Sequence, residues 1–233
     1  MLKGGAKTFA SALVELIRRD IIAGSLPPGS RLPIKALSER YGAGPIPLRE
    51  ALARLSAVGL VTAREQRGFW VAQTSPEELE SILALRLNLE VIALKESIAN
   101  GTYEWEAQLL AAHHRLAHHT ARKADEGSTG IGEEWDKAHK AYHLALLAGC
   151  KSRWLMQFVN TLSDQMNRYR HLSMHSGDPA RRDIAAEHKA LLEAALARDA
   201  GRAAALLEEH LTRTATLALR AMARMEAQAP TAK

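Results

Sequence analysis

The chain has 233 residues, a net charge of +5 and 47% hydrophobic residues, which is enough for the core of one large domain or of two modest ones. Its single cysteine, Cys150, excludes a disulfide framework and a thiolate metal cluster, as is usual for a reducing compartment. The first 24 residues lack the continuous apolar stretch of a signal peptide or a spanning helix, so we expect a cytoplasmic protein with no membrane partner.

The excess positive charge lies in the first third of the sequence. Residues 1–75 carry eleven Lys and Arg and five Asp and Glu, whereas residues 76–233 carry twenty and twenty-one. A small basic domain ahead of a near-neutral one is typical of a polyanion-binding domain attached to a domain with another role, although a basic surface without a partner is the alternative. We predict domains at 1–75 and 76–228, followed by a disordered tail at 229–233.

The basic segment has the pattern of a helix-turn-helix. Apolar residues at helical spacing predict a first helix over residues 8–23. After a turn-rich connector, "IKALSERYG" predicts a short helix that ends at Gly42. A second short helix begins near Pro45, because proline is tolerated only in the first turn, and the stripe of Leu48, Leu52 and Leu55 is expected to be buried. Two short helices joined by a glycine-containing turn indicate a helix-turn-helix.

Two strand-like runs, "LVTAREQ" and "GFWVAQ", follow this second helix. They predict a two-stranded hairpin, or wing, with Arg64, Gln66 and Arg67 at its tip. Gly68 permits a close backbone approach, which suits contact with phosphate or with the minor groove. A hairpin that only caps the domain is the alternative.

The segment "PPGSRLPIKALSERYGAGPIPLREALARLSAVGLVTAREQRGFWVA" resembles the winged-helix domain of the GntR family of bacterial transcription regulators. Carried over, the resemblance implies DNA contacts from Arg31, Arg49, Arg67 and Gly68. Many relatives have Ser-Arg or Thr-Arg ahead of the "PLREAL" motif, where this chain has Gly44-Pro45, so an arginine for a guanine edge is missing and the operator sequence cannot be carried over. The full set of expected DNA contacts is Arg31, Lys35, Arg49, Arg54, Arg64, Gln66, Arg67 and Gly68.

The remainder of the chain shows helical patterns and no strand pattern. We therefore expect a mainly α protein, in which a winged helix-turn-helix precedes an all-α bundle of six or seven helices. Metal or ligand sites in such bundles are built from facing side chains in the core.

Four histidines in the bundle have spacings that would allow them to face one another. His139 and His143, in "HKAYHLAL", lie one helical turn apart, and His188 and His210 lie at similar distances from the turn at 199–201. Four converging imidazoles suit Zn²⁺ or Ni²⁺. Each histidine could instead be an ordinary polar helix residue, as we interpret "HHRLAHH" at 113–119, whose pairs have no later partners.

The bundle resembles the FCD effector domain of the FadR-type branch of the GntR family. In that domain an Asp-x-x-x-His pair and two later histidines bind a divalent metal that helps to hold a small carboxylate. His143, His188 and His210 match the three family histidines, whereas His139 stands where the family usually has Asp. The substitution removes a negative charge, which weakens metal affinity or leaves the imidazoles free to bind an anion directly.

Within this branch, "WEAQLLAAHHRL", "EEWDKAHKAYHLALLAGCKSRWLMQ" and "RYR" resemble the carbon-starvation-induced, glutarate-responsive repressors. The resemblance favours glutarate or a related dicarboxylate as effector. Its carboxylates need cationic partners, for which Arg86 and Arg170 are the candidates, with Asn88 and Tyr169 as weaker ones. Either arginine could instead lie on the surface.

The expected function is a homodimeric repressor that binds a pseudo-palindromic operator in double-stranded DNA and is released by a small dicarboxylate. A metal-responsive sensor and a ligand-dependent activator of the same fold are the alternatives. We do not expect an enzyme, because no nucleophile motif or positioned Glu base accompanies the histidines. The glycines of "GSTGIG" at 127–132 follow a helix and indicate a linker, and Cys150 is interpreted as a small buried residue.

Overall fold

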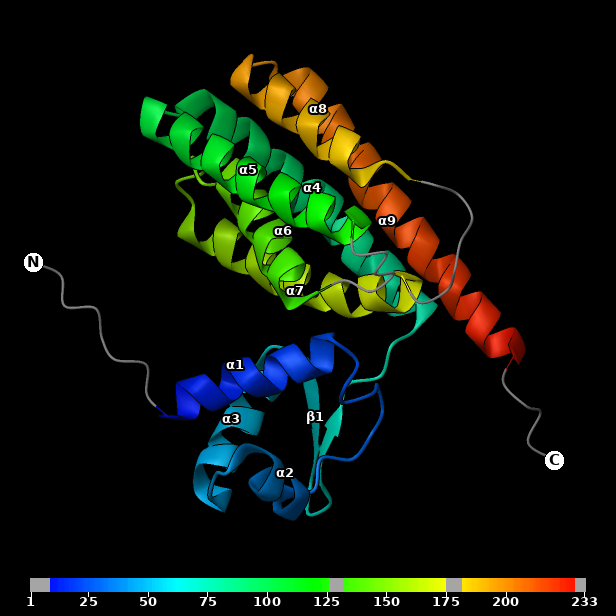
Figure 1. Cartoon of the computed structure of the whole chain (residues 1–233). Helices are drawn as coiled ribbons and strands as arrows, with labels where there is room; N and C mark the ends of the chain where they lie inside the picture. Colours follow the sequence, from blue (N-terminus) through cyan, green and yellow to red (C-terminus); the bar gives the residue numbers. More distant parts are fainter. Residues whose placement is uncertain (1–8, 126–131, 175–181, 229–233) are drawn as a thin grey trace, which may run out of the picture. The chain divides into compact units, whose positions relative to one another are not determined.

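The structure is a computed structural model that describes residues 9–125, 132–174 and 182–228. The chain divides into two compact units between Ser75 and Pro76 (Figure 1). The tail at 229–233 and most of the "GSTGIG" segment lie outside the described residues. None of the described helices combines the length and the apolar character that crossing a membrane requires.

The N-terminal unit is a winged helix-turn-helix, as the sequence predicts. Its elements are α1 (Phe9–Ile22), α2 (Ile34–Tyr41), α3 (Pro45–Ala57), β1 (Val61–Arg64) and β2 (Gly68–Val71). Gly42 closes α2 in the left-handed region, at φ 61°, and Gly44 starts α3 from an extended conformation with Pro45 in the first turn. Leu48, Leu52 and Leu55 are buried, so α3 is anchored by one face and leaves its other face exposed.

The wing is an antiparallel pair whose register runs from Val61 opposite Val71 to Arg64 opposite Gly68. Three residues close it, and the Arg67 N–H donates to the carbonyl of Arg64 at 3.0 Å. Gln66 and Gly68 have φ angles of 56° and 105°, so the tight turn depends on a glycine at position 68.

The C-terminal unit contains six described helices, which confirms the all-α prediction. They are α4 (Pro76–Asn100), α5 (Tyr103–Asp125), α6 (Glu133–Leu146), α7 (Arg153–Met174), α8 (Ile184–Leu196) and α9 (Ala200–Gln228). Helix α4 packs against α7 and α9, α5 packs against α6 and α8, and α8 packs against α9 (Figure 1).

Hydrogen bonds between helices fix the position of α6 within this unit. The buried Tyr142 hydroxyl donates to the carbonyl of His188 on α8 at 2.7 Å. The indole N–H of Trp105 on α5 donates to the carbonyl of Ala145 at 2.9 Å. Because α6 carries two of the candidate metal ligands, these contacts set the separation of His139 and His143 from the ligands on α8 and α9.

Candidate functional site

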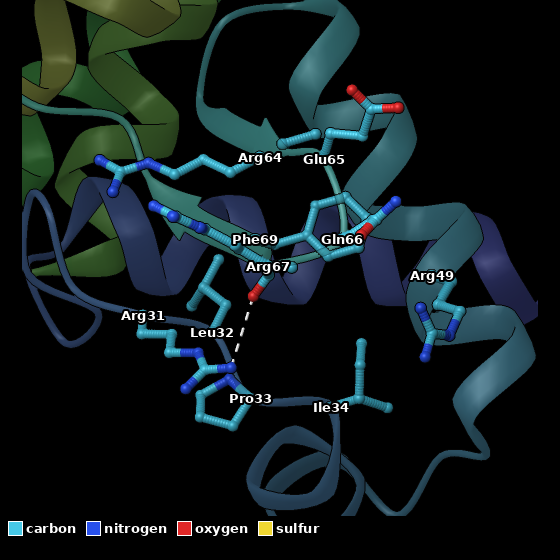
Figure 2. A pocket seen from close by; sticks show the side chains of 12 residues that line it. Arg31, Leu32, Pro33, Ile34, Arg49, Arg64, Glu65, Gln66, Arg67 and Phe69 are labelled. Carbon is cyan, nitrogen blue, oxygen red and sulfur yellow. Dashed lines mark hydrogen bonds between the residues drawn. The ribbon is translucent and has the colours of Figure 1, made fainter.

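The N-terminal unit gathers arginines around one concavity of about 460 Å³ (Figure 2). Six of the eight residues expected to contact DNA line it, namely Arg31, Arg49, Arg64, Gln66, Arg67 and Gly68. All six residues are exposed. The concavity combines four guanidinium groups from the connector before α2, from α3 and from the wing. Such a set of cations suits a phosphate backbone.

Trp70 and the wing backbone hold two of these arginines in place. The guanidinium carbons of Arg31 and Arg64 lie 5.7 and 4.6 Å from the centroid of the Trp70 ring. Arg31 Nη2 also donates to the carbonyl of Arg67 at 3.4 Å, a contact drawn in Figure 2. The wing tip is therefore joined to the segment that precedes α2.

Two expected DNA contacts lie outside this concavity. Lys35 is exposed on α2. Arg54 is exposed on α3, where it pairs with Glu50 one turn earlier and donates to the hydroxyl of Ser11 at 3.3 Å. The side chain of Arg54 is thus already engaged within the unit.

In the C-terminal unit, four histidines from three helices converge. His139 and His143 come from α6, His188 from α8 and His210 from α9, and one ring nitrogen of each lies within 4.8 Å of the others. The ring centroids of His139 and His143 are 4.6 Å apart, and those of His188 and His210 are 4.8 Å apart. Three of the rings are buried, and His139 is half-buried. We call these four residues the histidine cluster.

The four rings of the cluster are kept in their neutral form. Burial, with smaller contributions from neighbouring cationic groups, lowers the pKa of His139, His143 and His188 well below 6.5 and lowers that of His210 as well. The rings are therefore neutral at pH 7, which is the form that ligates metals. Nε2 of His143 and Nε2 of His188 are buried without a hydrogen-bond partner, and such orphaned nitrogens fit a divalent ion.

Comparison with known proteins decides the family. The model of bacterial regulatory proteins of the gntR family matches residues 9–71, and that of the FCD domain matches residues 81–213. The chain is 38% identical over 222 residues to the uncharacterized HTH-type transcriptional regulator BphR of Paraburkholderia xenovorans, with 89% of this chain and 90% of the relative covered. It is also 38% identical over 210 residues to the HTH-type transcriptional repressor GlaR of Escherichia coli, with 89% and 94% covered. The chain belongs to the GntR family.

The family assignment confirms three predictions made from the sequence. The protein is a DNA-binding transcription regulator, it carries an FCD domain after the winged helix-turn-helix, and it is not an enzyme. The structure of McbR/YncC from E. coli shows the same fold, with a TM-score of 0.77 at 23% identity and coverage of 91% of this chain and 97% of that one.

Within the FCD domain, Arg170 from α7 borders the histidine cluster. Its Nη1 lies 2.6 Å from Nδ1 of His139, and its Nη2 donates to Asp136 Oδ1 at 2.6 Å. Asp136 Oδ2 lies 2.8 Å from Nε2 of His171. Asp136, one turn before the position where the family usually has its Asp, therefore serves Arg170 and His171 rather than the cluster. Burial lowers the pKa of Arg170, although the guanidinium remains charged.

Arg86 from α4 is also buried near the cluster. Its Nε donates to Glu90 Oε1 at 2.5 Å, and the two side chains are 8% and 2% exposed. Its positive charge contributes, after burial and the other histidines, to the lowered pKa of His143. The structure thus places both candidate carboxylate-binding arginines beside the histidines.

The two weaker candidates for effector contact have their side chains in other surroundings. Asn88 is exposed and donates from Nδ2 to the carbonyl of Ala84 at 2.8 Å. Residues two apart point to opposite sides of a helix, so Asn88 cannot share the face of Arg86. The fully buried Tyr169 hydrogen-bonds Glu78 through its hydroxyl and packs in a separate apolar cluster with α4 and α9.

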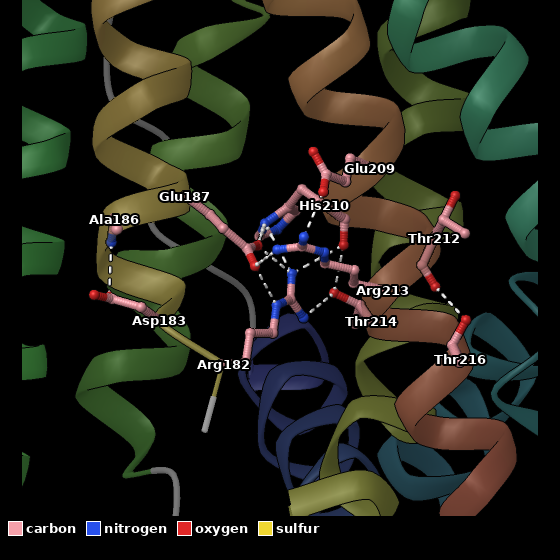
Figure 3. A network of polar contacts seen from close by, with 10 residues as sticks. All are labelled: Arg182, Asp183, Ala186, Glu187, Glu209, His210, Thr212, Arg213, Thr214 and Thr216. Carbon is pink, nitrogen blue, oxygen red and sulfur yellow. Dashed lines mark hydrogen bonds and ion pairs between the residues drawn. The ribbon is translucent and has the colours of Figure 1, made fainter. Parts of the chain in front are cut away.

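A polar network behind His210 was not expected from the sequence (Figure 3). Glu187 Oε2 lies 2.8 Å from Nδ1 of His210, and Arg182 donates from Nε to Glu187 Oε1 at 2.8 Å. Arg182 also donates from Nη2 to the carbonyl of His210 at 3.0 Å and from Nη1 to Thr214 Oγ1 at 2.8 Å. Although burial opposes it, donation from His210 and Arg182 holds the pKa of Glu187 well below its usual range. The one feature of the sequence that could have indicated this network is Glu187, whose carboxylate directly precedes His188.

Proposed function

We propose that this protein is a transcriptional repressor that leaves its operator when a small dicarboxylate, with glutarate favoured, binds beside the histidine cluster. The observation that supports the proposal most directly is that four neutral imidazoles and two buried guanidinium groups meet in one place. The relative from E. coli named as the repressor GlaR supports repression as the direction of control. The resemblance to glutarate-responsive repressors supports the choice of effector.

The histidine cluster would hold a divalent ion, for which Zn²⁺ and Ni²⁺ suit an all-imidazole donor set. His143, His188 and His210 present buried neutral rings, and His139 is the fourth candidate. When bound, the ion supplies a concentrated positive charge that attracts a carboxylate. The chain itself keeps the rings neutral by burial and fixes His210 through Glu187.

The buried arginines would receive the carboxylates of the effector. Arg86 donates to Glu90 from Nε, which leaves the two Nη groups of its fork for an incoming carboxylate. Arg170 is oriented by Asp136 and His139 on one side of the cluster. A dicarboxylate would thus meet cationic groups from α4 and α7 as well as the donors of α6, α8 and α9, and its binding would restrain all of these helices.

The proposed homodimer uses the outer face of α4 and α7, which pack together. Four large apolar side chains on these helices are exposed, namely Leu85, Ile92, Trp154 and Phe158. Exposed apolar side chains gathered on adjoining helices suit a self-complementary interface. A dimer places two recognition helices on a pseudo-palindromic operator, where Arg31, Lys35 and Arg67 would contact phosphates and Arg49 would orient α3. Because coupling is reciprocal, operator DNA should weaken effector binding by the same factor as effector weakens DNA binding.

Calorimetric titration with glutarate tests the proposal on the wild type, His143→Ala, Arg86→Ala and the control His118→Ala, which alters an exposed histidine. Metal content is measured on the same samples, and operator release is followed by fluorescence anisotropy. Micromolar binding that is lost in His143→Ala and Arg86→Ala but kept in His118→Ala supports the site. If the protein contains metal but neither binds glutarate nor releases its operator in response to it, the assignment of glutarate as effector is overturned.

A parallel titration with EDTA separates the metal from the effector as the signal. When EDTA removes the metal, the proposed repressor should remain bound to its operator DNA and should no longer be released by glutarate. Release of the operator by EDTA alone would instead show that the metal is the signal.

A further inference from the structure

Two histidines of the cluster have opposite hydrogen-bonding environments. Nδ1 of His139 lies 2.6 Å from Nη1 of Arg170, and Nδ1 of His210 lies 2.8 Å from Oε2 of Glu187. A guanidinium has five N–H donors and no acceptor, whereas an ionised carboxylate only accepts. Arg170 therefore requires an unprotonated Nδ1 on His139, whereas Glu187 requires a protonated Nδ1 on His210.

For His139, the neighbour requires a bare Nδ1. Because Arg170 can only donate, Nδ1 of His139 accepts the hydrogen bond and carries no proton. The proton of the neutral ring then resides on Nε2. A metal ligand needs a free lone pair, but Nδ1 already accepts from Arg170 and Nε2 is protonated. As long as Arg170 stays in place, His139 is a hydrogen-bond donor and not a ligand.

For His210, the neighbour requires a protonated Nδ1. Glu187 has no proton to give, so His210 donates from Nδ1 to Oε2 and keeps a bare lone pair on Nε2. Arg182 Nη2 also lies 3.1 Å from the same Nδ1, but this nitrogen donates to Glu187 Oε2 at 2.5 Å and to the carbonyl of His210 at 3.0 Å. The hydrogen bonds of Arg182 are thus satisfied without Nδ1, and the contact with Glu187 decides the tautomer.

We propose that His143, His188 and His210 alone hold the divalent ion, and that His139 donates its Nε2–H to the carboxylate effector. The half-buried His139 lies at the more exposed side of the cluster, since the other three rings are buried. Its ring is fixed between the stacked indole of Trp135, 4.7 Å away, and the guanidinium of Arg170. Three neutral ligands leave the full charge of the ion available to an anion, as a site for a dicarboxylate requires.

This assignment rests on the proposed function for the identity of the anion, but the tautomers can be measured without metal or effector. The experiment uses the full chain labelled with ¹⁵N-histidine and records long-range ¹H–¹⁵N correlations of the rings, assigned with single His→Gln variants. Spectra are taken without metal, after one equivalent of Zn²⁺, and after addition of glutarate. We expect His139 to be protonated on Nε2 in all three states, and His210 on Nδ1. A His139 ring protonated on Nδ1, or one that shows zinc coordination, would overturn the assignment.

A pair of matched variants then separates the two roles. The Zn²⁺ affinity of His139→Gln should stay within about threefold of the wild type, whereas that of His143→Gln should fall by more than about 100-fold, beyond the loss of an outer hydrogen-bond partner. The Co²⁺ absorption spectrum of His139→Gln should likewise be unchanged. In His139→Ala, which has no donor, glutarate affinity should fall about 10- to 100-fold, as for loss of a hydrogen bond to a charged group.

The outcomes distinguish this inference from the proposed function. If the wild type binds neither Zn²⁺ nor glutarate, the proposed function fails, and with it the donor role toward glutarate, while the tautomers still show whether Arg170 dictates the state of His139. If both bind and His139→Gln loses Zn²⁺ as His143→Gln does, the proposed function stands and the role assigned to His139 is overturned.

Discussion

The two units of the chain place their charged groups in opposite ways. In the winged unit, the arginines around the concavity are exposed, and Asp20 is the one buried charged residue within residues 9–75. The FCD domain buries many polar and charged residues, namely Arg86, Glu90, Ser97, His143, Gln165, Asn167, Arg168, Arg170, His171, His188 and His210. An exposed cation costs little and attracts a polyanion, whereas a buried charge must be compensated by a counterion or a ligand. The first unit is thus suited to a large partner outside it, and the second to a small ligand within it.

Two ion pairs of the same type make this contrast concrete. Glu50 and Arg54 on α3, and Arg86 and Glu90 on α4, are both pairs one helical turn apart. The side chains of the first pair are each 49% exposed, while those of the second are 8% and 2% exposed. Composition and spacing are alike, although Glu precedes Arg in the first pair and follows it in the second, so burial is the main difference between the two pairs.

The largest expected contrast is in the response to acid. Burial lowers the pKa of the four cluster histidines below 6.5 in the folded state, while the unfolded chain keeps ordinary values. As the pH falls through 6.5, these histidines bind protons in the unfolded state but not in the folded state, so the free energy of unfolding decreases. At one pH unit below 6.5, the loss is about 1.4 kcal/mol for each histidine that stays neutral. Residues 1–75 contain no histidine and should be unaffected.

Urea unfolding of the metal-free chain at pH 7.5 and 5.5, read by pulse-labelling hydrogen exchange and mass spectrometry, reports the two units separately. Replacement of a cluster residue in His188→Gln should reduce the pH dependence, whereas His118→Gln, at an exposed position, should not. Equal losses in both units, or a bundle that is more stable at pH 5.5, would contradict the buried neutral state of the rings.

Breaking the buried ion pair should have the next largest effect. Arg86→Met leaves Glu90 buried without its cation, and such a loss typically costs about 3–5 kcal/mol of unfolding free energy. The double variant Arg86→Met/Glu90→Leu removes both charges and should recover most of that stability. Urea unfolding at pH 7.5 measures both variants. A single variant as stable as the wild type would show that Glu90 is not held by Arg86.

The elements of this structure could be predicted because their signals are local. Gly42, Gly44 and Pro45 set the turn and the start of α3, and the leucine stripe sets its buried face. The similar depth of His188 and His210 followed from helical rise and one antiparallel turn, which are regular enough to compare positions along two helices, whereas the place of His139 and His143 beside them was favoured by the family resemblance. Geometry of this kind requires no knowledge of side-chain conformations.

The surroundings of the cluster could not be predicted in the same way. Whether Asp136 serves the cluster or Arg170 depends on rotamers and on the separation of α6 and α7, which no local pattern records. Arg182 and His210 are 28 residues apart in the sequence, and they meet only through the packing of α8 against α9. The position of Asn88, by contrast, could have been predicted, because helical periodicity alone puts residues two apart, such as Arg86 and Asn88, on opposite sides of a helix.

A smaller effect is expected at the concavity of the winged unit. Arg67 lines it with an exposed guanidinium, so Arg67→Ala should weaken binding to different DNA sequences almost equally. The slope of log affinity against log salt should decrease by about one for each phosphate that the variant no longer neutralises. Arg153→Ala, an exposed arginine at the start of α7, is the matched control in the other unit. Anisotropy titrations at several salt concentrations measure the slopes, and equal changes in both variants would exclude a specific role for Arg67.

The smallest effect is expected where the exposed ion pair is broken. Arg54→Met removes the partner of Glu50, but solvent can hydrate the remaining carboxylate, so the free energy of unfolding should change by less than about 1 kcal/mol. Because Arg54 is engaged with Glu50 and Ser11 and lies outside the concavity, operator affinity should also fall less than in Arg67→Ala. Unfolding and anisotropy measurements on the same protein test both statements. A loss as large as that of Arg86→Met would mean that burial does not distinguish the two pairs, and the contrast between the units would then need another cause.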